Sequence, residues 1–266
     1  MGGAQMRLLE AFSASLLLMS GAADARIDAA AFGTLSFRQH PGAQLPLDAT
    51  LSDEAGHPVR LGNLIDNRPA LLVLEYLRCR TLCGLVLRGA VHSLREAGLQ
   101  PGRDVELVAV SIDPRDSSAD AAAARNMYAA SFADPSAASG MHFLTGASGE
   151  VARVASAVGF PYRFDKPSGQ FAHPAGFVVT TPGGKISRYM LGLDPPAATL
   201  RQAVAEAGAG SVEPPAHPLL LLCFGYDPDE GTAAALAMRL VRWVSAGAIL
   251  GAILLIAFLS LRRRPA

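Results

Sequence analysis

Between residues 47 and 207 the chain alternates short apolar runs with segments of helical periodicity. Two nearly unbroken apolar runs, 70–77 and 105–112, are typical of buried strands in a sheet that is covered on both faces. The full set of elements that the pattern predicts is a hairpin of 47–51 and 59–61, strands 70–77, 105–112 and 143–144, helices 83–97, 117–132 and 150–158, a second hairpin of 176–181 and 185–191, and a helix 200–207.

The order of these elements predicts an α/β fold of the thioredoxin-like type over residues 26–207. Strand, helix, strand and helix come first, and a hairpin and a last helix follow. A buried strand that runs directly into a cysteine pair at the start of a helix is typical of the same fold. Residues 208–238 are expected to form a linker and a membrane-proximal segment, because 208–218 is rich in glycine and proline.

The N-terminus has the form of an export signal. Arg7 supplies a small positive region, 8–19 is mostly apolar, and Ala23-Asp24-Ala25 has the small-x-small form of a signal peptidase site. The apolar stretch is shorter than the roughly 20 residues that a spanning helix needs. We therefore expect a signal peptide of residues 1–25, with a buried helix or a retained anchor as the alternatives.

The C-terminus has the form of a membrane anchor. Residues 243–261 carry no charge and come close to the roughly 20 apolar residues that a bilayer demands. Trp243 stands where an interfacial aromatic residue is expected, and the three arginines at 262–264 favour a cytoplasmic tail. The prediction is a transmembrane helix 239–262 with a cytoplasmic tail 263–266. The soluble domain then faces the periplasm or extracytoplasmic space from the inner (plasma) membrane, where thiols can oxidise.

Composition narrows the classes of protein. The 23 basic and 23 acidic residues balance, and this neutrality argues against a non-specific nucleic-acid binder. Half of the residues are apolar and only 17% are charged, which excludes a disordered chain. Three cysteines are too few for a disulfide scaffold. The chemistry is therefore sought in individual side chains of one folded domain.

Two of the cysteines, Cys79 and Cys83, are four residues apart. On a helix this spacing places both sulfurs on one face. They open a helix, where the unpaired N–H groups and the helix dipole stabilise a thiolate, and Arg78 and Arg80 add positive charge that should lower the thiol pKa. Two thiolates on one face suit a soft ion such as Cu(I). The same pair can instead close a disulfide.

A third copper ligand would come from one of the six histidines. His173 stands in the loop before the strand that starts near Gly176. In a thioredoxin-like sheet this loop lies close to the helix terminus that bears the cysteines. An imidazole there completes a Cys2His set that serves both Cu(I) and Cu(II). Two simpler interpretations stay open, namely a plain disulfide for the cysteines and a surface or capping role for the histidine.

Several motifs resemble the Sco/SenC family. They are Cys79-x-x-x-Cys83 after the strand 71–76, the stretch from Val110 to Asp116, Leu144-Thr145-Gly146, and the segment 172–177 that contains His173. The similarity extends from about Leu47 to Leu193, and the segment 220–228 is also close. The resemblance implies a membrane-anchored, thioredoxin-like copper protein of a bacterial subgroup with a C-terminal anchor. Such proteins are associated with assembly of the binuclear copper centre of cytochrome c oxidase.

The resemblance also implies roles for individual residues. The copper ligands of the family carry over to Cys79, Cys83 and His173. Asp113 falls in the loop where the family has Asp-Pro-x-x-Asp and this chain has the shorter Asp113-Pro114-Arg115-Asp116. There it is expected to shape the loop and tune the site, with structural capping as the alternative.

The chain departs from the family pattern near the cysteines. Arg80 and Gly84 stand where the family usually has proline after each cysteine, and Leu77-Arg78 replaces the usual residues ahead of the motif. A proline in the first turn would fix the backbone, so its loss is expected to loosen this loop. The subgroup often has a histidine where Gly225 stands. Because that histidine is absent here, we expect no second site at Cys223 and interpret Cys223 as a packing residue at the membrane edge.

Three functions compete on this site. The first is a non-enzymatic metallochaperone that passes copper to a copper-accepting subunit of cytochrome c oxidase. The second is a thiol–disulfide oxidoreductase that keeps acceptor cysteines reduced through Cys79 and Cys83, supplied by a thiol reductant or thioredoxin-like donor. The third is a peroxiredoxin-like peroxidase, which ranks last because Thr81 follows Cys79 instead of preceding it.

Overall fold

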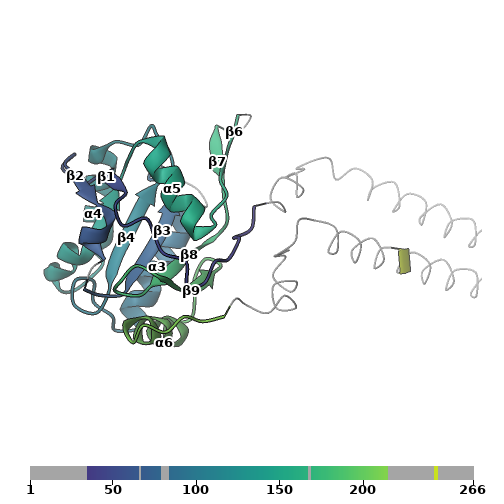
Figure 1. Cartoon of the computed structure of the whole chain (residues 1–266). Helices are drawn as coiled ribbons and strands as arrows, with labels where there is room; N and C mark the ends of the chain where they lie inside the picture. The colour runs from purple at the N-terminus through teal and green to yellow at the C-terminus, as the bar shows by residue number, and fades with distance from the viewer. Residues whose placement is uncertain (1–34, 66, 79–83, 167–168, 215–242, 245–266) are drawn as a thin grey trace, which may run out of the picture. The chain divides into compact units, whose positions relative to one another are not determined.

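The computed structural model describes residues 35–65, 67–78, 84–166, 169–214 and 243–244. At the centre lies a five-stranded sheet in the order β5–β4–β3–β8–β9 (Figure 1). Its strands are β3 (Ala70–Glu75), β4 (Glu106–Ser111), β5 (Met141–Leu144), β8 (Gly176–Thr180) and β9 (Ile186–Leu191). Strands β3, β4 and β5 run parallel, whereas β8 is antiparallel to β3 and β9 is antiparallel to β8.

The helices follow the strands in the order expected for this fold. They are α3 (Gly84–Glu96), α4 (Ser118–Ala129), α5 (Ser148–Val158) and α6 (Ala197–Gly208), with short 3₁₀ helices η2 (Leu61–Leu64) and η3 (Pro135–Gly140). Helix α4 begins with a capping box, in which the Ser117 side chain accepts from the Asp120 N–H and the Asp120 carboxylate accepts from the Ser117 N–H. This cap fixes where the loop after β4 ends.

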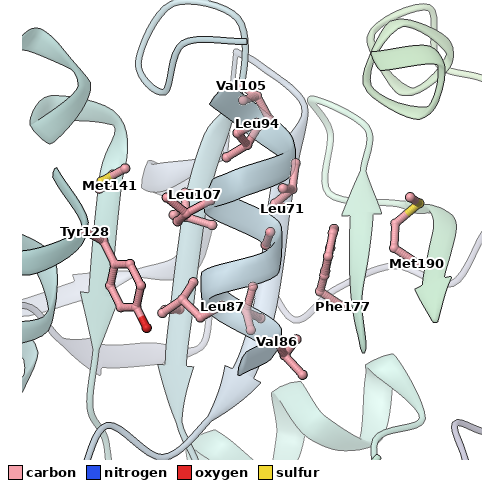
Figure 2. Packing of buried hydrophobic residues seen from close by; sticks show 14 of the residues in the cluster. Leu71, Val86, Leu87, Leu94, Val105, Leu107, Tyr128, Met141, Phe177 and Met190 are labelled. Carbon is pink, nitrogen blue, oxygen red and sulfur yellow. The ribbon is translucent and has the colours of Figure 1, made fainter. Parts of the chain in front are cut away.

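The two faces of the sheet are covered by different segments. Side chains alternate in direction along a strand, so Leu71 and Leu107 belong to one buried cluster and Leu72 and Val108 belong to the other. The first cluster includes side chains of α3, α4 and α6, and Figure 2 shows α3 packed over the strands on this face. The second includes α5 and buried residues from 37–65. Burial on both faces explains the unbroken apolar runs of β3 and β4.

The structure confirms the thioredoxin-like α/β fold. Each expected strand and helix between 47 and 207 is present, with ends that differ by a few residues. The early hairpin consists of β1 (Thr50–Ser52) and β2 (Pro58–Arg60). Within the described ranges no helix combines the length and apolarity needed to cross a bilayer. The expected signal peptide, and all of the expected span except two residues, lie outside those ranges.

One hairpin was not expected from the sequence. Strands β6 (Arg163–Asp165) and β7 (Gln170–Ala172) pair antiparallel, with Phe164 opposite Phe171. They form a two-stranded sheet of their own, which extends away from the five-stranded sheet (Figure 1). His173 follows β7 directly, so this hairpin carries one of the predicted ligands.

Candidate metal site

His173 lies beside the carboxyl end of β3. Its ring meets Tyr76, the residue after β3, edge to face at a centroid distance of 6.0 Å. The ring also stacks on Phe160 at a centroid distance of 5.4 Å. The cysteine motif begins three residues after Tyr76, so the predicted histidine stands where the sequence leads toward the cysteines. Cys79 and Cys83 themselves lie outside the described residues, as does Cys223.

The ring of His173 has one satisfied and one unsatisfied nitrogen. Nδ1 lies 2.9 Å from the carbonyl oxygen of Pro174. A carbonyl oxygen only accepts, so this contact assigns the hydrogen to Nδ1 and leaves the lone pair on Nε2. Nε2 is buried and has no hydrogen-bond partner in the described part of the chain. A buried nitrogen lone pair without a partner is unfavourable, and a bound metal ion would satisfy it.

A turn at the end of α5 places Phe160 against this ring. The helix ends at Val158 and is capped by Gly159, whose φ of 65° is in the left-handed region. A Cβ at this position would lie 1.8 Å from the carbonyl oxygen of Arg38, so both the conformation and the close approach require glycine. The turn returns the chain so that Phe160 covers one face of His173.

Burial lowers the pKa of His173 below its ordinary value of 6.5, and the hydrogen bond to Pro174 only partly opposes this shift. An unfolded chain would take up a proton at this side chain near pH 6.5, whereas the folded protein resists it. The stability that His173 contributes is therefore complete above pH 6.5 and declines as the pH falls below that value. We expect an NMR titration of the metal-free protein to place the midpoint of His173 below 6.5. A midpoint at or above 6.5 would show that the ring is not buried as described.

The loop after β4 carries a carboxylate and a guanidinium, those of Asp113 and Arg115, which pair with each other. The carboxylate of Asp113 accepts from the backbone N–H of Arg115 at 2.9 Å and pairs side by side with its guanidinium at 2.7 and 2.8 Å. Burial opposes ionisation of Asp113, but the bonds from Arg115 outweigh it, and the pKa of Asp113 is lowered. Asp113 therefore shapes this loop, as the sequence suggested.

Sequence reasoning missed Asp116, the second acid of the same motif. Its side chain is fully buried and accepts from the backbone N–H of Leu77 at 2.7 Å, from Nε of Arg78 at 2.9 Å and from the hydroxyl of Ser111 at 2.6 Å. Leu77 and Arg78 directly precede Cys79, so Asp116 anchors the approach to the cysteine motif. The Asp113-Pro114-Arg115-Asp116 spacing was the available signal, but the family resemblance implied a role only for its first acid.

Arg78 has a different environment from the one that the sequence suggested. Its guanidinium pairs with Asp116, lies 3.9 Å from Asp120 and donates to the carbonyl oxygen of Arg115. The nearby carboxylates therefore compensate its charge, which weakens the expected effect of Arg78 on the thiols. Its observed contacts instead hold the chain ahead of Cys79.

The other histidines have different surroundings. His142 contacts Glu106 at 3.3 Å, near the start of β5, and His92 contacts Asp194 at 3.3 Å. His57 is exposed in the turn between β1 and β2. Across the described ranges no three histidine, cysteine, aspartate or glutamate side chains cluster to hold a metal. The predicted partners of His173, Cys79 and Cys83, lie outside these ranges.

The comparisons decide the family. The sequence model of the SCO1/SenC family matches residues 39–208, which is more than half of the chain. The chain belongs to the SCO1/SenC family. The family match includes both cysteines and His173, and it agrees with the resemblance seen in the motifs.

Several solved structures are similar to this SCO1/SenC protein. A proposed electron transfer protein from Aquifex aeolicus VF5 is 24% identical with a TM-score of 0.57, covering 64% of this chain and 95% of its own. A SCO1/SenC family lipoprotein from Bacillus anthracis str. Ames is 17% identical with a TM-score of 0.52, covering 63% and 96%. ScoI of Arabidopsis thaliana, solved with copper bound, is 18% identical with a TM-score of 0.47, covering 65% and 98%. Among curated proteins no match was found.

Proposed function

We propose that this SCO1/SenC protein is a copper metallochaperone that delivers copper to the binuclear copper centre of cytochrome c oxidase. Cys79, Cys83 and His173 would hold the ion. The observation that carries the proposal is the buried Nε2 of His173, which bears a lone pair and has no hydrogen-bond partner in the described part of the chain. A histidine with a purely structural role would be expected to satisfy both ring nitrogens.

The proposed ligands suit copper as a cargo. Two thiolates are soft ligands that favour Cu(I), and an imidazole nitrogen also accommodates Cu(II). The hydrogen bond from Nδ1 to Pro174 holds the tautomer that leaves Nε2 available, which is the usual role of an outer partner of a metal-binding histidine. Transfer would proceed by ligand exchange, with cysteines of the acceptor subunit displacing those of the donor one at a time.

The proposed location follows from the two ends of the chain. Residues 1–25 would direct export, and the helix 239–262 would anchor the protein in the inner membrane with the domain outside the cytoplasm. Donor and acceptor then share one membrane, which raises their effective concentration. A thiol reductant or thioredoxin-like donor would keep the two cysteines reduced.

Oxidase assembly in cells separates copper delivery from thiol exchange. We expect a deletion strain that carries His173→Ala to lose most oxidase activity at limiting copper, because the variant lacks a direct Cu(II) ligand. His57→Ala is the matched control, since its side chain is 78% exposed, and it should restore activity fully. Cys79→Ser should fail under either function.

The competing function gives a different result in the same strains. A thiol–disulfide oxidoreductase needs both cysteines and has no need of His173. Normal oxidase assembly with His173→Ala, together with failure of Cys79→Ser, would therefore reject copper delivery that depends on His173 and would favour thiol exchange.

A further inference from the structure

The β6–β7 hairpin contacts the rest of the domain through aromatic side chains. The ring centroid of Phe171 lies 5.2 Å from that of Phe164 within the hairpin and 5.9 Å from that of Tyr76 at the end of β3. No ladder of the described strands joins the hairpin to the five-stranded sheet. Side-chain contacts such as that of Phe171 with Tyr76 therefore connect this hairpin to the end of β3.

Arg115 contacts the same aromatic pair from the loop after β4. Its guanidinium carbon lies 5.1 Å from the ring centroid of Phe164 and 6.0 Å from that of Phe171. Both distances are within the range of a cation–π interaction. The guanidinium is fixed in orientation by Asp113, whose side chain is only 2% exposed. The cation is therefore held over the hairpin from a rigid support.

The loop that carries Arg115 also touches the approach to the cysteines. The carbonyl oxygen of Arg115 accepts from the Arg78 guanidinium, and Asp116 accepts from the backbone N–H of Leu77. The loop between β4 and α4 thus contacts both the hairpin that carries His173 and the segment that leads into Cys79.

We propose that Arg115 is a positioning residue, which holds the β6–β7 hairpin against the Asp113 loop and thereby keeps His173 in place for metal binding. This inference rests on the proposed copper function for its effect on affinity, but not for its effect on the hairpin. Arg115 does not contact the ion in this role.

The test uses full-length protein purified in detergent, with Arg115→Ala, Arg115→Lys and Arg163→Ala. In metal-free Arg115→Ala we expect faster amide hydrogen exchange at 163–172 and unchanged exchange in β3 and β4. Cu(II) affinity should fall by about 2- to 10-fold, as expected from the loss of a partly exposed cation–π contact and the support behind it. Arg115→Lys keeps the cation but loses the paired geometry with Asp113. Its Cu(II) affinity and its exchange at 163–172 should therefore lie between those of the wild type and Arg115→Ala. Arg163→Ala removes an exposed arginine of the same hairpin and should match the wild type.

Epistasis with the ligand completes the test. Arg115→Ala should lower Cu(II) affinity no further in a protein that already carries His173→Ala. An equal loss in both backgrounds, or unchanged exchange at 163–172, would overturn the inference. A wild-type protein that binds no copper would reject the proposed function, and hydrogen exchange alone would then decide whether Arg115 holds the hairpin.

Discussion

Replacing His173 with alanine is expected to weaken Cu(II) binding by at least about 100-fold, because loss of a direct ligand should exceed the 10- to 100-fold effect of an outer partner. Cu(I) binding should weaken less, since two thiolates already suit this soft ion. Competition titration of the reduced full-length protein against a chromophoric chelator measures both affinities.

The thiol chemistry of the same variant provides an internal control. Exchange with glutathione disulfide should stay within about twofold of the wild type, because the two cysteines remain. His142→Ala is a second control, because it also removes an imidazole, but one that contacts Glu106 near the start of β5 and is not a proposed ligand. Unchanged Cu(II) affinity in His173→Ala would show that the buried Nε2 is not a ligand.

Asp116→Ala is expected to cause the largest loss of stability. The variant removes the acceptor of the Leu77 N–H and of the Ser111 hydroxyl at a fully buried position. Hydrogen bonds to a charged group contribute about 1.5–3 kcal/mol each, and the orphaned donors add a desolvation cost. We expect the free energy of unfolding to fall by about 2–4 kcal/mol, measured as a lower midpoint in urea.

Two further variants separate this role from a general effect of charge. Asp116→Asn keeps one acceptor oxygen and should lose less stability. Asp48→Ala removes a carboxylate that is 74% exposed and paired with Arg153 at the surface, and it should leave the urea midpoint unchanged. A midpoint for Asp116→Ala equal to the wild type would mean that Asp116 does not anchor Leu77 and Arg78.

The strands and helices of the core were predictable because burial dictates their pattern. Strands β3 and β4 are covered on both faces, so their residues are apolar without interruption. The β6–β7 hairpin lacked such a signal, because its strands are three residues long and Phe164 is 41% exposed. The hairpin is instead contacted by Tyr76 and Arg115, which are distant from it in sequence.

The sequence predicted only part of the candidate site. His173 stood out by its place before a buried strand, and the family pattern supported it. Which carboxylate contacts which arginine depends on how the loop turns, and spacing alone does not determine this. The structure therefore assigned Asp113 to Arg115 and Asp116 to the residues before Cys79.

The most direct measurement is the X-ray absorption spectrum of copper in the loaded, full-length protein. If both thiolates and the buried imidazole meet at one ion, the spectrum will report two sulfur ligands and one nitrogen ligand, and the nitrogen will disappear in His173→Ala. Copper surrounded only by oxygen and nitrogen, or a nitrogen signal that survives this substitution, would contradict a Cys79, Cys83 and His173 site.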